Sequence, residues 1–220
     1  MKELDTIGET GLRFFGKVSA SISHEIKNTL AVINENAGLM EDLTLMAEKG
    51  MELDPVRVRG LAGKILAQVQ RSDGIVKNLN RFAHSIDETG KTVDVEETAT
   101  FTALLAARLG SVRGVTFKTV SPEKPIRILT SPFFLEALLF RCLEIAMTAP
   151  DADKTIYLKP ETTEANIQVR LTGMDLKEAW DEGGFPTEED RALLNLLEAD
   201  IEVNSTKGEI VLILTTGEND

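Results

Sequence analysis

Two long stretches without proline, each with apolar residues at helical spacing, constrain the fold of this chain most strongly. The first runs from about residue 6 to residue 49, and its apolar residues recur at threes, fours and sevens: Ile22, Ile26, Ile33, Met40 and Leu43. The second runs from Pro55 to about residue 86, through Val58, Leu61, Ile65, Val69, Ile75, Leu79 and Phe82. Between them, Gly50 suits a helix C-cap, Asp54 an N-cap and Pro55 a first helical position. The pattern predicts an antiparallel helical hairpin.

Helices of this length expose more apolar surface than one hairpin can cover. At 1.5 Å per residue they would each span about 45–60 Å. We therefore expect two copies of the chain to pair as a homodimer, with the hairpins forming a four-helix bundle. The residues expected in the core of that bundle include Phe14, Phe15, Met40, Leu43 and Met46.

The second half of the chain follows a mixed pattern. Residues 87–92, DETGKT, have the composition of a linker. Helices are expected over about 95–109, 131–147 and 187–198, and strands over 115–120, 126–129, 155–160, 166–172, 201–205 and 209–216. Helices mixed with hairpin-connected strands predict an α+β fold, with a sheet covered by helices on one face. The predicted domains are therefore a hairpin over residues 1–90 and an α/β sandwich over residues 91–220.

Composition excludes several classes of protein. Cys142 is the single cysteine and there are two histidines, so a disulfide within the chain and a structural zinc site are not expected. The net charge is −12, and residues 91–220 carry 13 Lys and Arg against 23 Asp and Glu, which argues against nucleic acid as a partner. No apolar run approaches the roughly 20 residues of a membrane span, and the N-terminus lacks the apolar region of a signal peptide. We expect a cytoplasmic protein.

A histidine, a glutamate and an asparagine lie close together in the first predicted helix. Successive residues of an α-helix are about 100° apart, so His24 lies opposite the stripe of Ile22 and Ile26, and Asn28 stacks one turn beyond it. A neutral imidazole is a competent nucleophile near pH 7, and the neighbouring Glu25 carboxylate can accept a proton. The alternative is an ordinary solvated polar face, and helix geometry leaves both interpretations open.

The motif Ser23-His24-Glu25-Ile26-Lys27-Asn28, followed by Leu30 and Ile33, resembles the dimerisation and phosphotransfer domain of sensor histidine kinases. The resemblance covers residues 1 to about 88. It implies that His24 carries a phosphoryl group, that Glu25 acts as a base and that Asn28 assists dephosphorylation. The proline that usually follows the polar residue is Thr29 here, so the helix kink that this proline causes in the family is not assured.

The second half resembles the ATP-binding domain of the same family in the order of its elements, but not in its site residues. Ile145 stands where the family has its magnesium-binding asparagine, Arg141 stands at the earlier asparagine position, and Glu144 is one residue out of register. Leu171 replaces the adenine-binding aspartate, and only Gly173 of that motif is kept. No Gly-x-Gly-x-Gly lid follows. Losing all three elements predicts that this domain is degenerate and binds neither ATP nor a metal ion.

An intact phosphoacceptor hairpin beside a degenerate nucleotide site is similar to the dimeric histidine phosphotransferases of phosphorelays. That similarity implies a two-component signalling protein, a phosphotransferase or a response-regulator phosphatase. It would exchange a phosphoryl group between His24 and the aspartates of response-regulator receiver domains, without ATP and with Mg²⁺ only on the receiver. Two alternatives remain: a histidine kinase with a divergent ATP site, and a non-catalytic docking module that inhibits a kinase or a receiver domain.

Overall fold

The computed structural model describes residues 2–176 and 184–215. Their contacts divide the chain into two compact units, which are described separately. One unit is formed by residues 19–83, and the other by the described residues up to Val18 and from His84 onward. The first 18 residues therefore group with the second half of the chain, whereas the sequence placed them with the hairpin.

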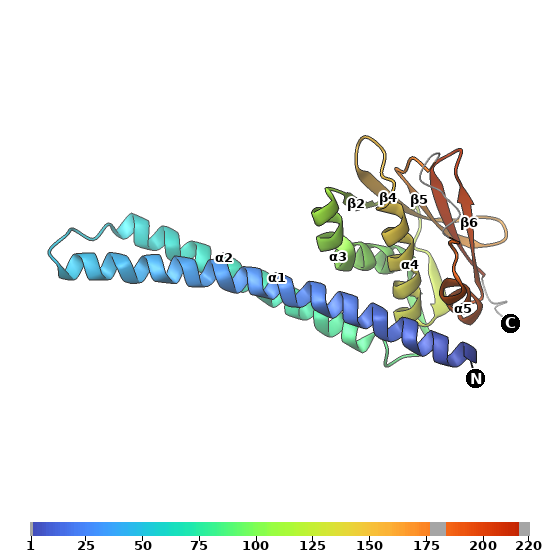
Figure 1. Ribbon diagram of the computed structural model, residues 1–220, viewed down its shortest axis with the longest axis horizontal. Helices are drawn as coiled ribbons and strands as arrows, with labels where there is room; N and C mark the ends of the chain where they lie inside the picture. Colours follow the sequence, from blue (N-terminus) through green and yellow to red (C-terminus); the bar gives the residue numbers. More distant parts are fainter. Residues whose placement is uncertain (1, 177–183, 216–220) are drawn as a thin grey trace. The chain divides into compact units, whose positions relative to one another are not determined.

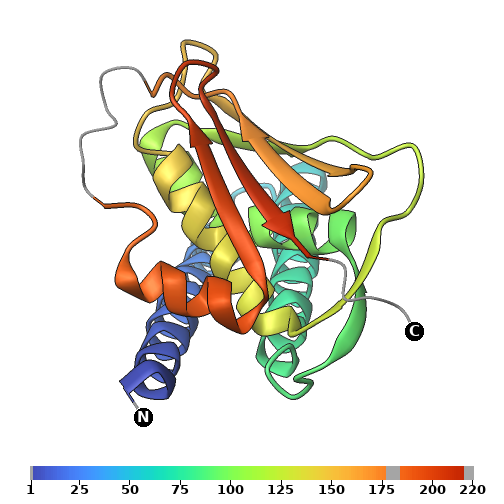
Figure 2. The ribbon, with the colours of Figure 1, turned by 90° about the vertical axis from the view of Figure 1, so that its right-hand side faces the viewer.

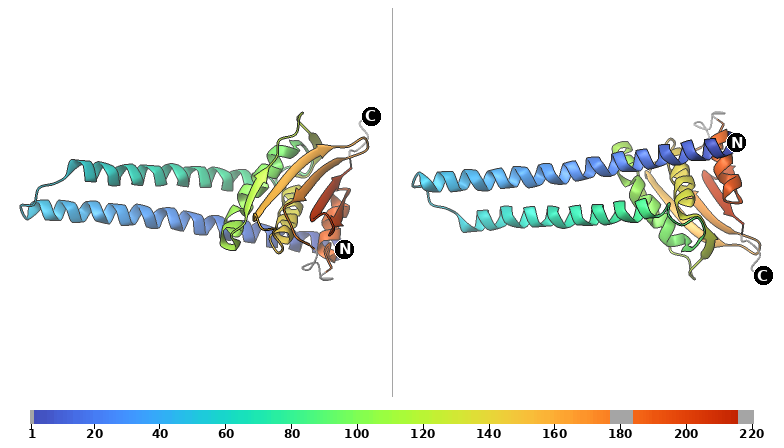
Figure 3. Two further views of the ribbon diagram at one scale, coloured as in Figure 1. Left: turned by 90° about the horizontal axis from the view of Figure 1, so that it is seen from above. Right: turned by 90° about the horizontal axis from the view of Figure 1, so that it is seen from below.

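The hairpin unit consists of two long helices. Helix α1 spans Lys2–Glu48 and contributes its residues from 19 onward, and helix α2 spans Pro55–His84. Figure 3 shows the two helices running antiparallel, side by side. Gly50 has φ +87, the left-handed conformation typical of a residue after a helix end, and the Asp54 side chain accepts a hydrogen bond from the Val56 amide at 2.9 Å. The predicted hairpin and its turn are confirmed.

The second unit is a mixed α+β fold (Figures 1 and 2). Its five-stranded sheet has the order β2-β4-β5-β7-β6. The strands are β2 (Thr116–Thr119), β4 (Thr155–Thr162), β5 (Ile167–Thr172), β6 (Ala199–Asn204) and β7 (Glu209–Leu214). Strands β2 and β4 are parallel and all other neighbours are antiparallel. The helices α3 (Val95–Arg113), α4 (Pro132–Ala146) and α5 (Glu188–Leu196) cover one face of the sheet, as predicted.

Alternation along β4 shows which face is covered. Ile156 and Leu158 are fully buried, while Tyr157 and Lys159, which alternate with them, are exposed. Successive side chains of a strand point to opposite faces, so the apolar set of β4 packs under the helices and the polar set lines the open face. The core of this unit therefore lies between the sheet and α4, whose buried residues include Leu135, Leu138 and Leu139.

One further strand departs from the sequence prediction. Residues Lys91–Asp94 form β1, which pairs antiparallel with β3 (Arg127–Thr130) in a separate two-stranded sheet. The predicted linker over residues 87–92 overlaps this strand, so that part of the prediction was wrong. Asp94 then ends the strand and caps α3, because its side chain accepts a hydrogen bond from the Glu97 amide at 3.1 Å.

The first turns of α1 pack on α4 within this second unit. The Phe14 ring lies 5.4 Å from that of Phe133 and 5.2 Å from that of Phe140, measured between centroids. A Cβ added at Gly11 would approach the Phe133 ring to 3.3 Å, so glycine allows a close approach there. Phe14 was expected in the core of the hairpin bundle, but it belongs to the α+β unit instead. Among the described residues, no helix is long and apolar enough to cross a membrane.

Candidate functional site

His24 lies on the exposed side of α1 in the hairpin unit. Ile22, on the opposite side, is only 6% exposed, whereas His24 and Asn28 are both exposed. Glu25 is half-buried beside them. The helix thus places His24 and Asn28 on one exposed strip with Glu25 one residue further round, in the arrangement that helical spacing predicts.

The candidate residues carry no competing interactions. Within residues 2–176 and 184–215, no hydrogen bond or ion pair includes the side chains of His24, Glu25 or Asn28. The His24 side chain is therefore exposed and, among the described residues, free of hydrogen bonds and ion pairs. A base and a nucleophile on a free enzyme often align only when the substrate binds, so this geometry leaves Glu25 available for proton transfer.

Thr29 fixes the helix directly after Asn28. It is only 1% exposed, and its hydroxyl donates a 2.8 Å hydrogen bond to the carbonyl of Ile26. The Ser72 hydroxyl of α2 lies 2.7 Å away. A threonine hydroxyl has a single proton, so Ser72 is the donor in this second bond. Helix α1 is continuous through this position. The link to α2 could not be read from local spacing, because Ser72 lies 43 residues away in the chain.

The second histidine has a carboxylate partner. His84, at the end of α2, has its Nδ1 atom 2.8 Å from Oδ2 of Asp87, and both side chains are mostly exposed. This pair holds the ring in one orientation beside the helix end. A solvent-exposed pair of this kind contributes little to stability.

The residues that stand at or near the magnesium-binding positions of the ATP-binding motif are paired with other side chains of this protein. Arg141 donates from Nε to Asp190 at 3.1 Å, and Asp190 is almost completely buried. The Arg141 guanidinium also lies 5.9 Å from the centre of the Phe185 ring. Glu144 accepts two hydrogen bonds from Lys17 of α1, at 2.7 and 2.9 Å. Glu144 is thus an ion-pair partner rather than an open carboxylate.

The residues at the remaining positions of the nucleotide motif have structural roles in packing or in the backbone. Ile145 is a half-buried residue of α4, and Leu171 is fully buried in β5. Gly173 has φ +95, and a Cβ there would lie 2.1 Å from the carbonyl oxygen of Thr155. The one glycine kept from the adenine motif is therefore required by the backbone itself. Most of the segment in which the glycine lid of an ATP-binding domain would fall lies outside the described residues.

The described residues hold few other candidates for chemistry. Three or more metal-ligating side chains do not cluster anywhere in them. Burial raises the pKa of the Cys142 thiol to about 12, and nearby Asp190 acts in the same direction, so Cys142 is an unreactive core residue.

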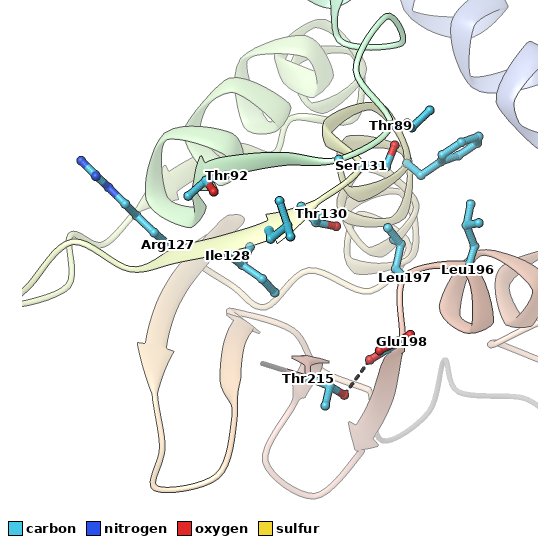
Figure 4. A pocket seen from close by; sticks show the side chains of 13 residues that line it. Thr89, Thr92, Arg127, Ile128, Thr130, Ser131, Leu196, Leu197, Glu198 and Thr215 are labelled. Carbon is cyan, nitrogen blue, oxygen red and sulfur yellow. Dashed lines mark hydrogen bonds between the residues drawn. The ribbon is translucent and has the colours of Figure 1, made fainter. Parts of the chain in front are cut away.

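A pocket of about 690 Å³ lies beside the two-stranded sheet (Figure 4). Its charged residues are Arg127 and Glu198. The backbone carbonyl of Glu198 accepts a 2.6 Å hydrogen bond from the Thr215 hydroxyl, drawn as the dashed line. The lining combines hydroxyl groups with leucines and includes neither histidine nor cysteine. It therefore does not provide a nucleophile paired with a base.

Comparisons with known proteins give structural similarities alone. No protein-family model matches the sequence, and no curated protein matches it either. The structure is similar to Acinetobacter baumannii histidine kinase AdeS at 12% identity and TM-score 0.45, covering 90% of this chain and 98% of that one. It is similar to the catalytic domain of histidine kinase ThkA (14% identity, TM-score 0.47, 60% of this chain, 100% of that one). It is also similar to the ATP-binding domain of PrrB from Mycobacterium tuberculosis, at 15% identity and TM-score 0.45, covering 60% of this chain and 100% of that one. Likeness at these identities does not extend to function.

Proposed function

We propose that this chain is a histidine phosphotransferase of two-component signalling, which accepts and returns a phosphoryl group at His24. The observation that carries the proposal is the exposed, unpaired imidazole of His24 with Asn28 one helical turn beyond it and Glu25 beside it. The motif that these residues form resembles the phosphoacceptor motif of sensor histidine kinases. A buried or fully hydrogen-bonded histidine at this position would have argued against the proposal.

The proposed transfer uses one ring nitrogen of His24 as the nucleophile. A bond forms between this nitrogen and the phosphorus of a phosphoaspartate on a receiver domain, as the bond from phosphorus to the aspartate oxygen breaks. The other ring nitrogen keeps its proton, and the Glu25 carboxylate stabilises the charge that develops there. The Asn28 amide orients a phosphoryl oxygen or, in dephosphorylation, a water molecule. The receiver supplies the Mg²⁺.

The proposal does not require ATP. Three observations support a pathway without it: Arg141 is held by Asp190, Glu144 is held by Lys17, and Leu171 is a core residue. A site that held Mg-ATP would need an open metal ligand and a polar contact for the adenine. We therefore infer that the phosphoryl group comes from a protein partner.

The proposed active form is a homodimer. Helix α1 exposes Leu30 and Leu45, and helix α2 exposes Leu66, Val69 and Val76, each by more than a third. Large apolar side chains gathered on two long helices favour an apolar partner surface. Two hairpins packed as a four-helix bundle would supply that surface for each other.

A docking module without chemistry is the second candidate. The observation that favours it is that no hydrogen bond joins Glu25 to His24 among the described residues, so the imidazole is not held for attack. Such a module would bind a kinase or receiver domain and leave His24 unmodified.

Transfer from phosphorylated receiver domains separates the two candidates. A panel of receivers carrying radiolabelled phosphoaspartate is mixed with the wild type, with His24→Ala and with His84→Ala as the matched histidine control. We expect acid-labile label on the wild type and on His84→Ala, and none on His24→Ala. Wild type that binds a receiver tightly yet acquires no label from any of them would establish the docking module. Labelling by Mg-ATP alone would instead establish a histidine kinase.

A further inference from the structure

Strand β2 forms one edge of the five-stranded sheet, and its backbone has an unpaired side. The Thr116 amide donates to the Lys154 carbonyl at 2.9 Å, and the Val120 amide donates to the Leu158 carbonyl at 2.8 Å. In a parallel ladder, alternate residues direct both backbone groups to the same neighbour. The N–H and C=O groups of Phe117 and Thr119 therefore point away from β4. Within the described residues, no hydrogen bond to these groups is present.

A groove runs along this edge, between β2 and helix α3. It has a volume of about 710 Å³. We call it the α3–β2 groove, and its lining includes Glu96, Thr100, Ala103, Leu104, Ala107 and Phe117. Leu104, a large aliphatic residue of α3, is 49% exposed at this groove. Small residues beside an exposed leucine leave room for an incoming side chain.

A strand added antiparallel to β2 fits both features. Two of its residues, lying opposite Thr119 and Phe117, would exchange paired hydrogen bonds with them. Because side chains alternate along a strand, both of these residues would point toward α3 and into the groove. The residue opposite Phe117 would meet Leu104 and Ala107, which favours an aliphatic side chain.

The charge of the groove indicates which side chain fits opposite Thr119. Glu96 is the charged side chain of the groove lining, and the Ser121 hydroxyl donates to it at 2.5 Å, which places it near the C-terminal end of β2. The residue opposite Thr119 would therefore lie beside a carboxylate, at the N-terminal end of the α3 helix. Residues 91–220 also hold more acidic than basic side chains, which favours a positively charged partner. A lysine or arginine is complementary to this end of the groove.

We propose that the α3–β2 groove binds an extended segment of a partner protein as an added antiparallel strand, with a lysine or arginine two residues before an aliphatic residue. Backbone hydrogen bonds to Phe117 and Thr119 would supply the register, and the groove would supply the sequence preference. This inference concerns the α+β unit alone and is independent of any chemistry at His24.

The test is an NMR titration of the ¹⁵N-labelled full-length protein with the capped heptapeptide Gly-Thr-Lys-Thr-Leu-Thr-Gly. We expect the amide signals of Phe117, Thr119 and the exposed face of α3 to shift at peptide concentrations up to about 1 mM, which corresponds to roughly 4 kcal/mol of binding. The same peptide with glutamate in place of lysine should bind more weakly. Absence of shifts at this concentration, or equal binding of both peptides, would overturn the proposal.

Substitutions then identify the contacts. Thr119→Pro removes the outward N–H group, which does not take part in the ladder with β4, and also replaces the Thr119 side chain in the groove. It should weaken binding by about fivefold or more, the effect of at least one lost hydrogen bond. Leu104→Glu should abolish binding, whereas Val112→Glu, on the same helix at 76% exposure but outside the groove, should not change it. Equal effects of Leu104→Glu and Val112→Glu would contradict the proposed contact. If Thr119→Pro instead changed the oligomeric state, a second copy of the chain would occupy the edge and the proposed partner would be wrong.

Discussion

The hydroxyl of Ser72 on α2 lies 2.7 Å from the hydroxyl of Thr29 on α1, one residue beyond Asn28. It ties the two helices of the hairpin together at the position where the histidine kinase family usually has a proline. A proline there would have no backbone N–H to donate and no side-chain oxygen to accept a hydrogen bond from Ser72. In this chain a polar contact between helices therefore stands where the family relies on a break in the helix, and it fixes the helical turn that carries the candidate residues.

Removing this contact should destabilise the hairpin. Thr29→Val keeps the shape of the side chain but leaves the Ser72 hydroxyl without its acceptor, so we expect a loss of about 1–3 kcal/mol in the free energy of unfolding. Thr44→Val is the matched control, because the Thr44 hydroxyl makes a similar bond to the Glu41 carbonyl at 2.7 Å on the exposed surface. Urea denaturation measures both. Equal losses would show that the hydrogen bond between the helices contributes nothing.

Glu25 and Asn28 should affect different steps of the proposed transfer. Glu25→Ala should slow phosphoryl uptake by about 10²–10⁴-fold, because the carboxylate that stabilises the charge on the imidazole is lost. Asn28→Ala should slow the loss of the phosphoryl group more than it slows uptake. Quenched-flow measurement with a phosphorylated receiver checks both rates. Glu35→Ala and Asn34→Ala are controls on exposed positions of the same helix, and an effect as large in either control would rule out specific roles.

The long helices and the exposed site could be predicted from the sequence because their signals are local. Apolar spacing, Gly50, Asp54 and Pro55 define the hairpin, and the same spacing places His24 opposite Ile22. Strand β1 was missed because its partner, β3, lies more than thirty residues away in the sequence, and its own composition is polar. The stabilisation of β1 comes from pairing with β3, and the local sequence of β1 carries no signal of that pairing.

Helix α3 shows a second limit. The sequence suggested an end at about residue 109, just before Gly110, but the helix continues to Arg113 and ends at Gly114, with φ +69. Gly110 instead serves packing, since a Cβ there would lie 2.7 Å from the Phe117 ring and from the carbonyl oxygen of Val115. Two nearby glycines look alike in the sequence, and only the strand packed on the helix distinguishes them.

The homodimer should depend on the exposed apolar residues of the hairpin. Leu66→Glu places a charge on each copy of α2, at a side chain that is 63% exposed in the single chain. We expect the dimer dissociation constant to rise on the order of 100-fold, as for the loss of a central interface residue. Leu129→Glu, at a side chain that is 72% exposed in the α+β unit, is the control. Sedimentation velocity over a range of concentrations checks this, and a wild-type monomer at micromolar concentration would contradict it.

Cys142 should make stability fall at alkaline pH. Burial, with a smaller contribution from Asp190, raises its pKa from 9.0 to about 12. The unfolded chain therefore loses the thiol proton at lower pH than the folded chain does. The stabilisation is complete below pH 9 and is lost as the pH rises toward 12, by about 1.4 kcal/mol per unit. The difference in unfolding free energy between wild type and Cys142→Ala, measured from pH 8 upward, isolates this contribution. A constant difference across that range would contradict it.

Phe14 and Phe15 are adjacent in α1 but should differ sharply when replaced by alanine. Phe14 is 5% exposed and contacts the rings of Phe133 and Phe140, whereas Phe15 is 39% exposed. Phe14→Ala removes a buried ring from a packed cluster and should cost about 3–5 kcal/mol in the unfolding free energy. Phe15→Ala should cost less than half as much, because much of its surface already meets water in the single chain. Thermal and urea unfolding compare the two variants at matched concentration. If the order were reversed, the first turns of α1 would not be anchored on α4, and Phe15 would instead be buried against another copy of the chain.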